Sequence, residues 1–194
     1  MKAKAKIEII KNAIYEHNGV SKKLDGMENL LVNISDEVVK TFKKGGKVLF
    51  CGNGGSAADA QHLAAELSGK FFKDRAPLFA EALHTNSSFV TAVGNDYDFG
   101  MVYERAVLAK GKSGDILFGI STSGASENIL RAMKKARELN LTTILLTGNI
   151  REPQKLSELC SYVVMVPSTS TPRVQEAHIL IGHAICELVE EILF

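Results

Sequence analysis

Four side chains of the metal-ligand type lie on two segments of this sequence that have helical spacing. His62 and Glu66 are four residues apart, so on a helix they share one face and could converge on one ion or one substrate atom. Gln175 and His183 belong to a second segment near the C-terminus. A His/Glu pair at this spacing is also common on protein surfaces, so the first pair alone supports a metal site only weakly.

The spacing of Gln175 and His183 limits how they could bind one ion. Eight residues of a straight helix rise by about 12 Å, whereas the ligand atoms of a zinc ion lie only about 2 Å from the metal. If both side chains bind the same ion, we expect one of them to come from a neighbouring subunit, and the site then exists only in an oligomer. His178 lies between them among apolar residues, and we interpret it as a buried core histidine.

Two turns rich in glycine and serine have the composition of a phosphate-binding site. The first, CGNGGS, contributes Asn53, Gly54 and Gly55. The second, GISTSGAS, contributes four hydroxyl groups, those of Ser121, Thr122, Ser123 and Ser126. One hydroxyl is enough to cap a helix, so four hydroxyls before a helix favour an anion site over a simple N-cap. Neither turn has the spacing of a Walker A loop or of GxGxxG, which favours a phosphate monoester over a polyphosphate nucleotide.

Short apolar segments that alternate with amphipathic segments predict the elements that position these residues. Strands are expected at 47–51, 78–83, 115–120, 142–147 and 162–166. Helices are expected at 57–68, 87–93, 97–109, 126–139, 153–160 and 172–193, after two N-terminal helices that span about 7–18 and 24–44. This order predicts an α/β fold with a doubly wound, mainly parallel five-stranded sheet, in which ligands bind beyond the carboxyl ends of the strands.

Composition excludes several classes of protein. The chain has 194 residues, a net charge of +1 and three cysteines. The charge gives no general attraction to nucleic acid or to anionic membranes, and no apolar run reaches the ~20 residues of a membrane helix. The cysteines have the spacing of neither a disulfide framework nor a thiolate zinc site. We therefore expect a cytoplasmic protein with buried free thiols that binds neither nucleic acid nor membrane.

Four motifs together resemble one known family. CGNGGSAADAQHLAAELSGKF, AVGNDYDF, GISTSGASENIL and RVQEAHILIGHAICELVE occur here in the order found in the phosphoheptose isomerases of the sugar-isomerase (SIS) superfamily. The resemblance implies conversion of D-sedoheptulose 7-phosphate to D-glycero-D-manno-heptose 7-phosphate, the first step towards the heptose of bacterial lipopolysaccharide, capsule or S-layer glycans. It also implies a homotetramer with one zinc per active site, each site lying at a subunit interface. Residues 45–194 would form the SIS domain, and residues 1–44 a helical segment that packs on it and on partner subunits.

The resemblance also assigns roles to individual residues. The implied zinc ligands are His62, Glu66, Gln175 and His183, and Glu66 and His183 are the implied acid–base pair. The implied substrate contacts are Asn53, Gly54, Gly55, Glu66, Asn95, Asp96, Ser121, Thr122, Ser123, Ser126 and Gln175. Because a zinc-bound carboxylate or imidazole is a poorer proton carrier, either the substrate displaces a ligand during turnover or the metal is partly structural.

The main alternative is a non-catalytic relative. Some SIS-domain proteins bind the replication initiator DnaA, but they lack the helix glutamate and the C-terminal histidine that stand here as Glu66 and His183. Their presence favours an enzyme. His84, Asn86 and Asp98 depart from the usual family pattern, which leaves a related phosphosugar of another chain length open as the substrate.

Overall fold

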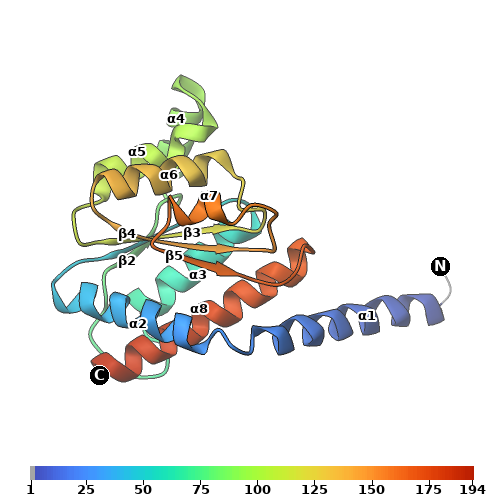
Figure 1. The fold of residues 1–194 in the computed structure, drawn as a ribbon. Helices are drawn as coiled ribbons and strands as arrows, with labels where there is room; N and C mark the ends of the chain where they lie inside the picture. Colours follow the sequence, from blue (N-terminus) through green and yellow to red (C-terminus); the bar gives the residue numbers. More distant parts are fainter. Residues whose placement is uncertain (1–2) are drawn as a thin grey trace.

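A single all-parallel sheet of five strands lies at the centre of the protein (Figure 1), whose computed structural model describes residues 3–194. The strands are β1 (Val48–Gly52), β2 (Ala80–Ala82), β3 (Ile116–Ser121), β4 (Thr142–Thr147) and β5 (Tyr162–Met165). Their order in the sheet is β2-β1-β3-β4-β5, and every neighbouring pair is parallel. The predicted doubly wound, five-stranded fold is therefore confirmed.

Helices cover both faces of this sheet. One face carries α2 (Glu28–Lys43), α3 (Gly55–Ser68) and α8 (Thr171–Leu193), and the other carries α5 (Val102–Lys110) and α6 (Glu127–Glu138), as Figure 1 shows. The remaining helical elements are α1 (Ala3–Ser21), α4 (Ser87–Asp96), α7 (Gln154–Ser157) and the short 3₁₀ turns Lys22–Leu24 and Phe99–Met101. α1 projects from the sheet, but its C-terminal half contacts the start of α8, where Nδ1 of His17 lies 2.8 Å from Oε2 of Glu176; Val20 is its only buried residue.

The alternation of side chains along each buried strand divides the interior into two apolar cores. Val48 and Phe50 of β1 pack with α2, α3 and α8, whereas Leu49 and Cys51 pack with the helices of the opposite face. Successive strand residues point to opposite faces, so a strand covered on both sides reads as a continuous apolar run. The three cysteines are free and buried, as expected.

Two predicted helices differ most from the structure, whereas the others differ by at most about four residues at either end. The helix expected at 97–109 is interrupted, because Asp98 has an extended backbone, with a φ of −155° and a ψ of 161°. Arg131 of α6 lies 3.5 Å from the Asp98 carboxylate, and the Arg105 guanidinium lies 4.2 Å from the centre of the Tyr97 ring. Of these two contacts, the one with Arg131 comes from another element, 33 residues further along the chain, and it accompanies the break. The helix expected at 153–160 is limited to the four residues of α7.

The position of the reversal in strand order determines where a ligand can bind. From β1 the chain passes first to β2 on one side, and β3 then lies on the other side of β1, paired from Val48↔Ile116 to Gly52↔Ile120. In such sheets, ligands bind in the crevice beyond the carboxyl ends of the two central strands. The two glycine- and serine-rich turns follow β1 and β3, so both lie at this crevice. In the described part of the chain, no helix is long and apolar enough to cross a membrane.

Candidate active site

The turn after β1 leads directly into α3 and leaves the start of that helix open. Gly54 is the N-cap residue and has a φ of +56°, a conformation that glycine adopts without strain. Within residues 3–194 no side chain caps α3. The Asn53 side-chain amide instead exchanges two hydrogen bonds of 2.9 Å with the amide of Asn128 on α6. This reciprocal pair fixes the distance between the two turns. Asn128 was not predicted as a site residue, because nothing local in the sequence shows that it faces Asn53.

Two hydroxyls of the turn after β3 bond to each other, and within the described residues none caps α6. Ser126 is the N-cap residue by position, but its hydroxyl lies 3.0 Å from the Ser121 hydroxyl and accepts no capping bond in the described chain. The exposed Ser123 hydroxyl accepts from the N–H of Ala125 at 3.2 Å. Thr122 is half-buried, and its carbonyl accepts from the N–H of Gly148 at 3.1 Å. The start of α6 therefore keeps N–H groups and hydroxyls available for an anion.

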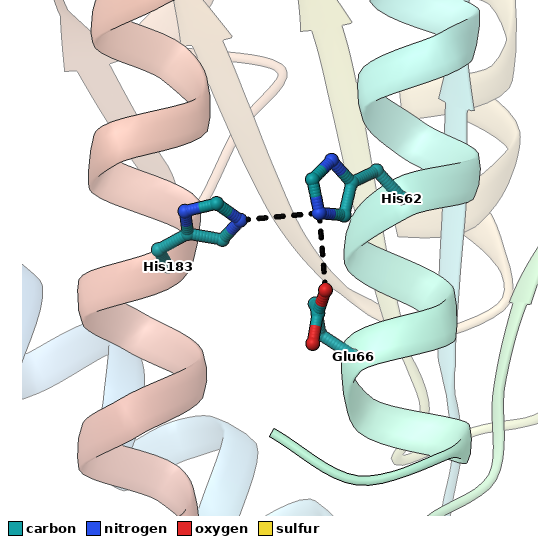
Figure 2. A group of neighbouring side chains, drawn as sticks. All are labelled: His62, Glu66 and His183. Atoms are coloured by element: carbon teal, nitrogen blue, oxygen red, sulfur yellow. Dashed lines mark hydrogen bonds and ion pairs between the residues drawn. The ribbon is translucent and has the colours of Figure 1, made fainter. Parts of the chain in front are cut away.

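His62, Glu66 and His183 converge between α3 and α8, as Figure 2 shows. The Nε2 atom of His62 lies 3.0 Å from Oε1 of Glu66 and 3.3 Å from Nε2 of His183. The two imidazole rings meet edge to face, with their centres 4.9 Å apart. The cluster is only partly buried, so a solute can reach it.

A close approach of the two helices brings these side chains together. α3 and α8 run side by side, with Gly55 opposite Gln175 near their beginnings and Leu63 opposite Gly182 further along. A Cβ atom on Gly182 would lie 2.5 Å from Cδ2 of Leu63, which is closer than side chains tolerate. Gly182 and Leu63 are the chain neighbours of His183 and His62. The missing side chain at Gly182 therefore allows the two histidines to meet.

Substituting Gly182 by Ala should separate the helices. Leu63 is 2% exposed and its side chain would have to shift within the core, so the overpacking should cost about 1–3 kcal/mol of unfolding free energy. Gly94→Ala in α4 is the matched control, since a Cβ there meets nothing within 4 Å. Both changes gain helix propensity, so the difference between the two variants in chemical denaturation isolates the clash. Equal stabilities would show that the contact of α3 with α8 is not tight at Gly182.

Gln175 lies apart from the cluster within the chain. Its side-chain Nε2 would be 2.4 Å from a Cβ on Gly55, so it packs against the start of α3, whereas His62 and Glu66 lie two and three turns further along that helix. The separation argued from the sequence is thus present in one chain. His178 is fully buried, and burial lowers its pKa to about 4, so the interpretation as a core residue is confirmed.

Asn95 and Asp96 are exposed at the end of α4. The Asn95 side-chain amide donates to the Asp96 carboxylate at 2.8 Å. No hydrogen bond within residues 3–194 joins either side chain to the two turns or to the histidine cluster. A single chain therefore does not bring these two residues to the rest of the candidate site.

Asp59 is a further site residue that the sequence analysis missed. It lies one helical turn before His62, and its buried Oδ2 atom has no hydrogen-bond partner within the described residues. Burial raises the pKa of the Asp59 carboxyl above its ordinary value, while the charge of His62 acts in the opposite direction. The sequence shows that Asp59 precedes His62 by three residues, which places the two near each other on a helix. It does not show that one oxygen of the Asp59 carboxylate is buried.

Two of the departures from the family pattern have structural roles. The Asn86 side chain caps α4 by accepting from the N–H of Phe89 at 3.0 Å. Asp98 lies against Arg131 of α6. His84 follows β2 and is half-buried, and burial lowers the pKa of its imidazole.

The chemistry of the cluster suits a divalent cation. The candidate ligand atoms of His62, Glu66 and His183 lie within 4.8 Å of one another, so small side-chain movements would bring them to the ~3.3 Å that separates tetrahedral ligands each about 2 Å from a zinc ion. The single Nε2 atom of His62 faces both a carboxylate and a second imidazole nitrogen, and one proton can bond to only one of them. Hydrogen bonds therefore leave lone pairs without a proton within this group of three side chains. Such lone pairs are suited to bind a metal ion.

The class of protein follows from a match to a known domain family. The profile of the SIS domain family matches residues 19–148. This range contains the turns after β1 and β3, together with His62 and Glu66 on α3.

The relatives then define the family within that class. A phosphoheptose isomerase of Rhodospirillum rubrum is 53% identical over 156 residues, which is 80% of this chain and 82% of that protein. One from Aliarcobacter butzleri is 47% identical over 185 residues, 95% of this chain and 97% of the relative. The solved phosphoheptose isomerase of Neisseria gonorrhoeae superposes with a TM-score of 0.87 at 38% identity, covering 95% of this chain and 98% of the other. The chain belongs to the phosphoheptose isomerase family. The predicted isomerase class is confirmed, and the non-catalytic alternative is not supported.

Proposed function

We propose that this protein interconverts D-sedoheptulose 7-phosphate and D-glycero-D-manno-heptose 7-phosphate. The observation that carries the proposal is the meeting of a carboxylate and two imidazoles between α3 and α8, on a helix that starts at a phosphate-type turn. From Gly55 to His62 the helix rises by about 10 Å. An extended seven-carbon phosphate ester can span such a distance, with its phosphate at the turns and its carbonyl end at the cluster. The product would supply heptose for a bacterial surface glycan, made in the cytoplasm.

The reaction requires a base, an acid and stabilisation of an oxyanion. Glu66 removes the proton from C1 of the ketose, the C–H electron pair forms the C1=C2 bond, and the C2 oxygen gains negative charge and then a proton. The C1 hydroxyl next loses its proton as C1=O forms, and C2 accepts a proton to give the aldose. His183 transfers the protons between the oxygens, since an imidazole can donate a proton from one ring nitrogen and accept one at the other.

We propose zinc as the metal of this site. His62, Glu66 and His183 of one chain would hold it, and Gln175 of a neighbouring subunit would complete the set. When bound, zinc acts as a Lewis acid that stabilises negative charge on the C1 and C2 oxygens. This assignment rests on the donor set and on its spacing within 4.8 Å.

The phosphate would bind at the paired turns. Ser121, Thr122, Ser123 and Ser126 offer hydroxyls, and the start of α3 offers the amides of Gly54 and Gly55. α3 and α6 both direct the positive ends of their helix dipoles towards these two turns. Asn53 holds the two turns at a fixed separation through Asn128.

The assembly we propose is a homotetramer with sites at its subunit interfaces. Several large apolar side chains of α1 are more than half exposed: Ile7, Ile9, Ile10, Ile14 and Tyr15. A helix that extends from the body of the protein with such a surface is stable only when another chain covers it. An interface would also bring in the partner's Gln175 and the α4 end that carries Asn95 and Asp96. Residues 1–44 would then pack both on the core of the domain, through α2, and on partner subunits, and residues 45–194 would bind the sugar phosphate.

The direct test is conversion of the ketose phosphate by purified protein. We expect the aldose 7-phosphate to appear at a rate typical of enzymes, about 1–10³ per second at saturation, as followed by NMR of the sugar carbons. A six-carbon ketose phosphate assayed in parallel tests the chain length. Conversion of neither sugar by zinc-loaded protein would contradict the proposal, and preference for the six-carbon sugar would change the substrate.

A further inference from the structure

A fully buried ion pair joins the end of α3 to α8, away from the histidine cluster. The side chains of Arg75 and Glu190 are 1% and 2% exposed, and Nε of Arg75 lies 2.8 Å from Oε1 of Glu190. Burying two charges is costly unless hydrogen bonds satisfy both groups. The hydrogen bonds of Arg75 and Glu190 therefore indicate the role of this ion pair.

Glu190 holds the loop that follows α3. Its carboxylate accepts from the backbone N–H groups of Phe71, Phe72 and Lys73 at 3.2, 2.7 and 2.9 Å. Burial alone would raise the pKa of the Glu190 carboxyl, but these N–H groups and Arg75 lower it to about 2. The carboxylate is therefore charged near neutral pH and holds the loop on α8 through these hydrogen bonds.

Arg75 caps the C-terminus of α3. Its guanidinium donates to the carbonyls of Glu66 and Leu67, each at 2.9 Å, and of Gly69 at 3.2 Å. The last carbonyls of a helix have no partner within the helix, and a positive charge is favourable at that end. One of the carbonyls that Arg75 holds belongs to Glu66 itself, which lies in the last turn of α3. Without this cap the turn that carries Glu66 would fray.

The same guanidinium thus contacts the helix of Glu66 and the helix of His183. Glu190 lies seven residues, about 10 Å, after His183 on α8. The two helices touch at Gly55 and Gln175, then at Leu63 and Gly182, and the buried pair is the third connection. It is the connection nearest to the end of α3 that bears Glu66. Proton transfer depends on sub-ångström placement of the base, so a loose last turn would slow it.

We propose that Arg75 and Glu190 form a clamp that fixes the Glu66 carboxylate relative to the His183 imidazole. Arg75 is a positioning residue, since it touches neither the cluster side chains nor the phosphate turns. The inference rests on the proposed function. The clamp lies at the far end of α3 from the phosphate turns, so it acts at the carbonyl end of the substrate, where the chemical step takes place, and leaves phosphate binding unchanged.

The test compares Arg75→Lys with a matched control on the same two elements. Lysine keeps the charge but cannot reach Glu190 and three carbonyls at once. We expect kcat per folded enzyme to fall by about 10- to 100-fold with KM changed by less than about twofold, because the phosphate turns lie about 16 Å away along α3. The control is Lys73→Met, which removes the exposed 2.9 Å pair of Lys73 with Glu191 between the same loop and helix. It should keep wild-type kcat and KM.

A purely structural role predicts a different pattern. Arg75→Lys would then lower the melting temperature but keep wild-type kcat once the folded fraction is measured, and that result would overturn the proposal. Should Arg75→Lys fail to fold, Glu190→Gln keeps the volume and leaves Arg75 on the α3 carbonyls. For this variant we expect a fall in kcat of about 3- to 10-fold at unchanged KM, and wild-type kcat would overturn the clamp.

A third readout is independent of isomerase activity. In a crystal structure of Arg75→Lys, or of Glu190→Gln if only that variant folds, the Glu66 carboxylate should have left its position 3.0 Å from His62. Zinc affinity, measured by competition with a chelating dye, should fall by about 10-fold or more. An unmoved Glu66 with unchanged zinc affinity would overturn the clamp even if the wild type proved inactive on heptose phosphates. Inactivity of the wild type alone would overturn only the proposed function.

Discussion

Replacing Glu66 by Gln should lower kcat by about 10³-fold, which corresponds to about 4 kcal/mol of transition-state stabilisation. The carboxamide has the size of the carboxylate and can still accept the hydrogen bond from His62 at 3.0 Å. The helix and its packing are therefore retained, while the base that removes the C1 proton is lost. The measurement is the initial rate of aldose phosphate formation at saturating ketose phosphate.

Two controls separate loss of the base from other causes. Glu187→Gln makes the same substitution at an exposed position of α8 and should leave kcat unchanged. The zinc content of Glu66→Gln shows whether a ligand was lost together with the base. A Glu66→Gln enzyme that keeps its zinc and more than about a third of wild-type kcat would exclude Glu66 as the base, since removal of a general base costs at least about 10².

Mixing two inactive variants should restore activity only if they lie on different sides of a shared site. Glu66→Gln and Gln175→Ala are each expected to be inactive. If Gln175 reaches the cluster of the neighbouring subunit, a hybrid assembled from equal amounts of both has intact sites where a chain with Glu66 meets a partner with Gln175. Random assembly gives about a quarter of the wild-type sites. The measurement is the specific activity after joint unfolding and reassembly.

The structure supplies the matched control for this experiment. His62, Glu66 and His183 meet within one chain, with His183 only 3.3 Å from His62. Mixing Glu66→Gln with His183→Ala should therefore restore nothing, because every site then lacks one of the two. Recovery in this second mixture would show that His183 serves the neighbouring site. Failure of the first mixture would show that Gln175 acts within its own chain.

Most of the architecture follows from local patterns in the sequence. The predicted strand at 142–147 has the same limits as β4, and the limits of the other strands differ from the predicted ones by at most two residues. Strands that are buried on both faces stand out as apolar runs. The predicted helix limits are wrong where contacts with another element determine the backbone conformation. At the break before α5, Asp98 contacts Arg131, which lies 33 residues further along the chain.

The candidate site was predictable to the extent that one helix or one turn contains it. The relation of His62 to Glu66 follows from the helical repeat, and the two phosphate-type turns are visible as glycine and serine motifs. The distance between Gln175 and His183 was also predictable, because a helix is rigid. The reciprocal bonds of Asn53 with Asn128 and the buried oxygen of Asp59 were not, since each depends on a neighbour from another element.

The sequence by itself determined the order of the elements, the residue types of the site and the family to which they belong. Only the tertiary structure decided that α8 lies against α3 with His183 beside His62, and that a buried Arg75–Glu190 pair connects the same helices beyond them. The physical reason is that periodicity and propensity act over a few residues. The approach of two helices depends on which side chains fit between them, as Leu63 fits against Gly182.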